Sequence, residues 1–178
     1  MITKIGIIAG NILELLEERN GVLVFGEIHT DLKQHRDLVL MSLGWLLYEK
    51  YVLILEDPWT AAYQVDDRNR TSMSTAGVFD LVVGSKVVTA ASKRIKNVLD
   101  HQGVVANKIL TLLEGCEGLL DLKTIAHNIN EHRDIILMSL GWLIREGCVK
   151  GIVGSNEVFV FHLSKETAST SVESFCHV

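Results

Sequence analysis

Apolar residues recur at helical spacing in two separate stretches of the chain. In the first stretch they are Ile5, Ile8, Ile12, Leu15 and Leu16. In the second stretch they are Val105, Ile109, Leu112 and Leu113. A glycine follows each set, Gly21 and Gly118, and glycine is the residue that most often ends a helix. Each stretch therefore predicts an amphipathic helix with a defined end.

The two stretches belong to an internal repeat. Displacement by 97 positions aligns residues 6–52 with residues 103–149 without a gap, and 22 of these 47 pairs are identical. The longest match sets HRDLVLMSLGWL (His35–Leu46) against HRDIILMSLGWL (His132–Leu143). We call residues 6–52, with the residues that complete the helix and the strands at their two ends, copy one, and residues 103–149, completed in the same way, copy two. Each copy is long enough to form a small domain of its own.

Both copies predict the same order of elements. A short apolar piece follows the first helix, and a second helix is expected at about 26–33 and 123–128. The twelve-residue block predicts a long third helix, with Asp37 and Asp134 in its first turn, where a negative charge suits the helix dipole.

Each third helix is followed by a potential β-hairpin. After copy two, CVKGIVGSNEVFVFHL contains two β-rich runs around Gly-Ser-Asn. After copy one, YVLILEDPWTAAYQV is the looser equivalent, with a turn at Asp57-Pro58.

The segment between the copies departs from the repeat. DDRNRTSMSTAG (Asp66–Gly77) is typical of an exposed linker. A basic amphipathic helix is expected after it, with Lys86, Lys93, Arg94 and Lys96 outside its apolar face. A solvated helix face is the simpler interpretation, and contact with nucleic acid or an acidic partner is the alternative. The expected organisation is 1–65 and 102–164 as domains, 66–101 as linker with the extra helix, and 165–178 as a flexible tail.

Composition limits the classes of protein that fit. The 178 residues carry a net charge of −5, which repels phosphate backbones unless a local basic patch is present. Three scattered cysteines, Cys116, Cys148 and Cys176, argue against a disulfide framework and a zinc site and fit a reducing compartment. The first residues contain no apolar run near 18 residues. We expect a cytoplasmic protein with no membrane association.

The end of the third helix resembles that of a winged helix-turn-helix. LIREGCV (Leu143–Val149) is similar to the stretch with which that fold leaves helix three for the wing, and copy one has Lys50 where the glycine would be. The GWL-x-R-E stretch also resembles a small, functionally uncharacterised prokaryotic winged-helix family. Copy two matches it fully, whereas copy one has Tyr48 for the arginine. The resemblance implies an α+β fold of two tandem winged helix-turn-helix domains, each of three helices and a β-hairpin wing, with an extra linking helix.

In that fold one side of helix three packs on the domain and the other enters the DNA major groove. The winged-helix pattern assigns Val39, Ser42, Leu43 and Leu46 to the core, with Ile136, Ser139, Leu140 and Leu143 in copy two. The outward positions are then apolar: Leu40, Met41, Gly44, Trp45, Leu137, Met138, Gly141 and Trp142. Exposed apolar patches mark interfaces, so we expect the copies to pair through these faces as a pseudo-dimer or between chains as a homodimer. Trp45 and Trp142 packed in their own domains, and insertion into a groove, are the alternatives.

No motif indicates catalysis. His-Arg-Asp is shared with the catalytic loop of protein kinases, but the chain has no glycine-rich phosphate loop and no Asp-Phe-Gly. The seven histidines show no ligand spacing, so neither metal nor cofactor is expected. His35, His132, Arg36 and Arg133 are most simply solvated starts of helices.

Two functions remain open. The first is a non-enzymatic regulatory or interaction module that self-associates through helix three and binds a protein partner. The second is a DNA-binding regulator that uses the Lys86–Lys96 helix, Lys150 in the wing, and Arg36 with Arg133.

Overall fold

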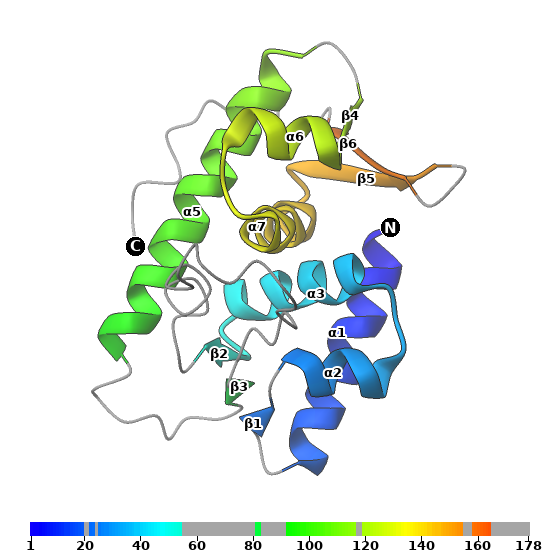
Figure 1. Cartoon of the computed structure of the whole chain (residues 1–178), viewed down its shortest axis with the longest axis vertical. Helices are drawn as coiled ribbons and strands as arrows, with labels where there is room; N and C mark the ends of the chain where they lie inside the picture. Colours follow the sequence, from blue (N-terminus) through cyan, green and yellow to red (C-terminus); the bar gives the residue numbers. More distant parts are fainter. Residues whose placement is uncertain are drawn as a thin grey trace, which may run out of the picture.

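A computed structural model describes residues 1–19, 22–23, 25–54, 81–82, 92–116, 119–154 and 158–164; for 22, 53–54, 81–82 and 92–99 it describes the backbone. The elements of copy two lie above those of copy one, and the third helices meet between them (Figure 1). Copy one contains α1 (Ile2–Glu18), β1 (Val22–Leu23), α2 (Phe25–Leu32), α3 (Arg36–Tyr48) and β2 (Leu53–Ile54). The later elements are β3 (Leu81–Val82), α5 (Ser92–Glu114), β4 (Leu120–Asp121), α6 (Leu122–Ile129), α7 (Arg133–Arg145), β5 (Val149–Val153) and β6 (Phe159–Leu163). The predicted α+β class is confirmed.

Two small antiparallel sheets accompany the helices. Their strand orders are β1-β3-β2 and β4-β6-β5. β5 and β6 pair from Val149 with Leu163 to Val153 with Phe159, so the hairpin predicted after copy two is confirmed. In copy one, β2 pairs with Leu81–Val82, in the segment that the sequence analysis assigned to the linker. The predicted turn at Asp57-Pro58 lies outside the described residues.

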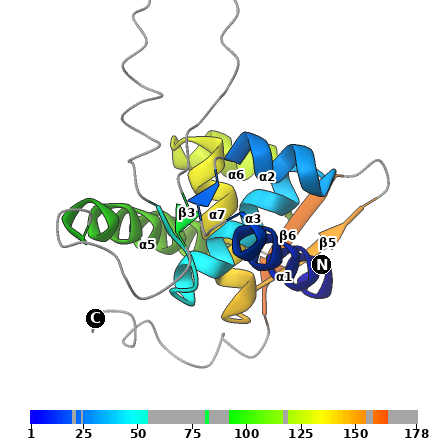
Figure 2. The ribbon, with the colours of Figure 1, turned by 90° about the horizontal axis from the view of Figure 1, so that it is seen from below.

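The region around residue 100 differs from the prediction. An extra helix followed by the first helix of copy two was expected, but α5 runs continuously from Ser92 to Glu114 (Figure 2). Polar residues at 100–102 interrupt the apolar spacing without stopping the helix. Gly103 lies inside this helix, where a Cβ atom would lie 3.4 Å from the ring of Trp142.

The first helix of each copy packs on the third helix of the same copy. Ser42 is fully buried, and its hydroxyl lies 2.9 Å from the carbonyl oxygen of Ile5 and 2.8 Å from that of Leu38. Ser139 repeats this arrangement, donating to the carbonyl of Gln102 at 3.1 Å. Both serines therefore face their own copy, on the side assigned to the core.

Gln102 is a buried polar residue where copy one has Ile5. Its side-chain amide donates to the carbonyl of Met138 at 3.1 Å, but its Oε1 atom has no hydrogen-bond partner among the described residues. An unsatisfied buried acceptor costs about 1–3 kcal/mol, more than the ~1 kcal/mol that a hydrogen bond contributes. We therefore expect Gln102→Ile to raise the free energy of unfolding by about 1 kcal/mol, measured by urea denaturation. Ile5→Gln should lower it, and a destabilised Gln102→Ile variant would contradict the argument.

Lys50 has the left-handed backbone conformation that Gly147 has at the equivalent position. The φ angles are 61° and 76°. A side chain in this conformation costs roughly 1–2 kcal/mol, while glycine adds about 0.5–1 kcal/mol of unfolded-state entropy. Lys50→Gly should therefore raise the free energy of unfolding by about 0.5 kcal/mol in thermal or urea denaturation, and Gly147→Lys should lower it. A lower stability of Lys50→Gly would show that the conformation is unstrained.

Candidate functional site

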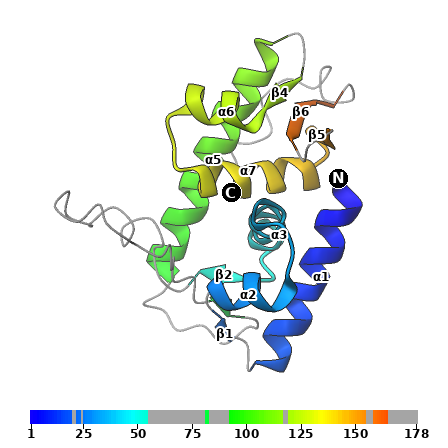
Figure 3. The same ribbon diagram turned by 45° about the vertical axis from the view of Figure 1, so that its right-hand side comes forward.

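α3 and α7 make the most extensive contact between any two elements of the described chain. Each lies on the inner side of its own copy (Figures 1 and 3). At this contact the structure places Met41, Gly44 and Trp45 against residues of α7, and Met138, Gly141 and Trp142 against residues of α3. Of the eight predicted interface residues, six are buried and two are half-buried; the buried ones are Leu40, Met41, Gly44, Leu137, Met138 and Gly141.

Two glycines set the distance between the helices. A Cβ atom on Gly44 would lie 2.6 Å from the Met138 Cα and would collide with the Met138 carbonyl. A Cβ atom on Gly141 would lie 2.7 Å from the Met41 Cα, with the same collision. The two backbones are therefore in direct contact at two equivalent points, and only glycine permits this separation.

The two tryptophans contact both copies. The ring of Trp45 lies against Gly6 of its own copy, and the guanidinium of Arg145 lies 5.2 Å from the ring centre. The ring of Trp142 lies against Gly103 and stacks on Tyr48, with ring centres 4.9 Å apart. Packing within its own copy and contact with the other copy were predicted as alternatives, but each tryptophan ring does both.

Tyr48 of copy one contacts Glu146 of copy two, and Arg145 of copy two contacts Glu49 of copy one. The Nε of Arg145 lies 2.6 Å from a carboxylate oxygen of Glu49. The pKa of Tyr48 is raised, first by burial and then by its hydrogen bond to Glu146. The arginine of the GWL-x-R-E stretch and its tyrosine replacement therefore both serve contacts between the copies.

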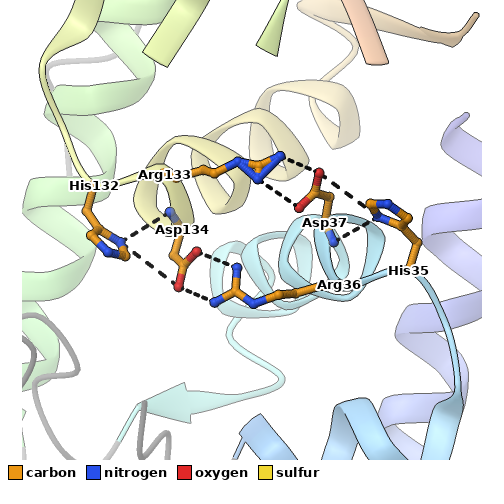
Figure 4. A network of polar contacts seen from close by, with 6 residues as sticks. All are labelled: His35, Arg36, Asp37, His132, Arg133 and Asp134. Carbon is orange, nitrogen blue, oxygen red and sulfur yellow. Dashed lines mark hydrogen bonds and ion pairs between the residues drawn. The ribbon is translucent and has the colours of Figure 1, made fainter. Parts of the chain in front are cut away.

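At the other end of the helices, the His-Arg-Asp triplets exchange ion pairs (Figure 4). The two terminal nitrogens of the Arg36 guanidinium each lie 2.7 Å from a carboxylate oxygen of Asp134. The Arg133 guanidinium reaches Asp37 at 3.2 and 2.7 Å. The two carboxylates are 4% and 7% exposed, and buried carboxylates need such partners. We call this set of two arginines and two aspartates the Arg–Asp exchange.

The histidines cap the helices that carry the exchange. The Nδ1 atom of His35 accepts the backbone N–H of Asp37 at 3.2 Å, and His132 does the same for Asp134 at 3.3 Å. Hydrogen bonding to Asp134, the largest influence, raises the pKa of Arg36. His35 and His132 with Arg36 and Arg133 do begin these helices, and the arginine side chains stay 35% and 49% exposed, but they also bind carboxylates of the opposite copy, which was not predicted.

No described contact joins the other predicted contact residues to this interface. Lys150 is exposed on β5, and Lys93, Arg94 and Lys96 fall in the first turns of α5. Lys86 lies outside the described residues. Sequence reasoning missed Asp37, Asp134, Glu49 and Arg145 as contact residues. The available signal was the adjacent opposite charges of Arg-Asp, present identically in both copies.

A cleft of about 640 Å³ lies beside the Arg–Asp exchange, lined by His35, Asp37, Asp121, Leu122, Lys123, Ala126, Arg133, Val158 and Phe159. This lining contains no serine, threonine or cysteine for His35 to activate. Within the described ranges, no cluster of three or more His, Cys, Asp or Glu side chains is placed to hold a metal ion. The helices of this part of the chain are too short or too polar to span a bilayer.

Comparisons with protein-family models, curated proteins and solved structures gave no match to the chain.

Proposed function

We propose that the chain is a non-enzymatic regulatory or interaction module of two winged-helix domains, whose helix-three faces pair with each other. The observation that carries this proposal is the reciprocal backbone contact of Gly44 with Met138 and of Gly141 with Met41. Such a surface favours pairing over insertion into a groove of DNA, since apart from two indole N–H groups it offers no hydrogen-bond donor to a base edge.

The winged-helix assignment is supported by the order of elements in copy two. A helix, a short strand, two helices and a β-hairpin follow one another, and β4 completes the sheet beside β6. In this assignment α7 is the recognition helix and β5 with β6 is the wing. Copy one has the same order, with β3 taking the place of the second hairpin strand.

The outer surfaces are then the sites for a protein partner. Ile7 and Val104 occupy equivalent positions on α1 and α5 and are 60% and 52% exposed. Ile152, Val153 and Val158 are exposed on the hairpin of copy two. Exposed apolar side chains on equivalent surfaces suit protein contact better than phosphate contact.

A DNA-binding regulator is the second candidate. The observation that favours it is the run of Lys93, Arg94 and Lys96 at the start of α5, together with exposed Lys150. In this case the chain would bind DNA through α5 and the wing, with helix three kept for pairing.

Fluorescence anisotropy with labelled random duplex DNA separates the two candidates. If the chain is an interaction module, its affinity for DNA should already be low at low salt and should change little as the salt concentration rises. A DNA binder with six to ten phosphate contacts should lose roughly 10³–10⁵-fold in affinity between about 50 and 200 mM salt. Lys93→Glu/Arg94→Glu/Lys96→Glu is the matched variant. Tight, salt-sensitive binding that this variant abolishes would replace the first proposal by the second.

A further inference from the structure

We infer that the α7 face is self-complementary and can pair with the α7 of a second copy of this chain, so that its contact with α3 covers a homodimerisation surface. This inference rests on the proposed function and goes further by identifying the partner surface. The inference states which helix α7 pairs with. The DNA titration tests a separate property, namely whether the outer surfaces bind DNA.

The Arg–Asp exchange carries the first step. Arg36 binds Asp134 and Arg133 binds Asp37, and positions 36 and 37 are equivalent to 133 and 134. Each arginine thus binds the aspartate that directly follows the equivalent arginine of the other copy. Since α7 carries both Arg133 and Asp134, two α7 helices in this geometry would form both ion pairs.

The glycine contacts carry the second step. Gly141 lies against Met41, which is equivalent to Met138 of α7 itself. A second α7 would therefore present a methionine backbone to each Gly141, as α3 does. An interface that joins equivalent patches in this way is isologous.

The C-terminal ends of the helices distinguish α7 from α3 as a self-partner. Arg145 contacts Glu49 and the ring of Trp45, whose equivalents on α7 are Glu146 and Trp142. In a pair of α7 helices, Arg145 of each helix would therefore meet Glu146 and Trp142 of the other. An α3 pair would have Tyr48 in place of both arginines and would lose both of these ion pairs. The α7 face is thus the one that favours a second copy.

In the unaltered chain the α3 contact wins because the two faces are tethered. Because both faces belong to one chain, each meets the other at an effective concentration set by the connection, without any new contact. Stacking of Tyr48 on Trp142 is an additional contact that α3 alone supplies. We therefore expect the unaltered chain to be a monomer of 19.8 kDa by light scattering.

Reversal of the charges in copy one tests the inference in the full chain. Arg36→Asp/Asp37→Arg places like charges opposite both Arg133 and Asp134, but leaves the α7 face unchanged. The variant should elute with twice the mass of the unaltered chain, and its Tm should rise with protein concentration. Adding Arg133→Asp/Asp134→Arg restores opposite charges within the chain and should return the monomer. Adding Gly141→Leu to the copy-one reversal should abolish the dimer, because the side chain blocks the close approach.

The outcomes separate clearly. A doubled mass that Gly141→Leu abolishes supports pairing through α7. A folded monomer after copy-one reversal would overturn the inference, as would a variant whose Tm is lowered at every protein concentration while the fourfold variant is restored. Neither of these two outcomes would contradict the contact of α3 with α7 in the unaltered chain. The DNA titration would still decide between the two proposed functions.

Discussion

Replacement of Gly44 and Gly141 together by alanine is expected to lower the free energy of unfolding by about 2–6 kcal/mol, since overpacking costs roughly 1–3 kcal/mol at each site. Each new Cβ would collide with a carbonyl of the opposite helix, and backbone atoms cannot rotate away as a side-chain tip does. The two helices must separate, which loosens every contact between them. Chemical denaturation with linear extrapolation measures the change.

Gly10 provides the matched control for this substitution. It lies inside α1, like the other two inside their helices, but a Cβ there would have nothing within 4 Å. Gly10→Ala should therefore raise the free energy of unfolding by about 0.5–1 kcal/mol through helix propensity alone. A loss below 1 kcal/mol in the double variant would show that the helices do not meet at their backbones.

Removal of the two carboxylates of the Arg–Asp exchange is the second large effect. Asp37→Asn and Asp134→Asn each leave a guanidinium without its charged partner. Breaking a fully buried pair costs about 3–5 kcal/mol, but the side chains of Arg133 and Arg36 are 49% and 35% exposed, so solvent compensates part of the loss. We expect about 1–3 kcal/mol per substitution, measured by chemical denaturation.

A double-mutant cycle on Asp37 and Arg133 isolates the contact itself. The exposed pair of Arg19 with Asp31, whose nitrogen and oxygen lie 3.0 Å apart, serves as the comparison, and Asp31→Asn should change stability by less than about 1 kcal/mol. A coupling energy for Asp37 with Arg133 no larger than that of the exposed pair would mean that the exchange does not stabilise the pairing of the copies.

Much of the fold was accessible from local pattern. Apolar periodicity located α1 and the C-terminal part of α5, and the twelve-residue block located α3 and α7. The hairpin of β5 and β6 followed from two β-rich runs around a turn. The strand at Leu81–Val82 was missed because two residues carry no alternation to detect, and its pairing with β2 is set by tertiary structure. Continuity of α5 was missed because polar residues broke a pattern without breaking the helix.

The α3–α7 interface could be predicted from the sequence only in part. Apolar residues at groove-facing positions of a helix identify an interface because water penalises their exposure. The exchange of Arg36 and Arg133 with opposite carboxylates was not predicted, because charged residues at a helix start satisfy local rules whether or not a second helix faces them. Their pairing depends on how the two copies are placed, which no local pattern encodes.

The differences between the two copies give the molecule a polarity. In a homodimer every substitution enters twice, so both ends must remain alike. Here each copy is encoded separately, and equivalent exposed positions differ, as Asn11 of α1 differs from Lys108 of α5. A partner that spanned both copies would therefore meet two different surfaces held at a fixed spacing, and one binding orientation would differ from its reverse.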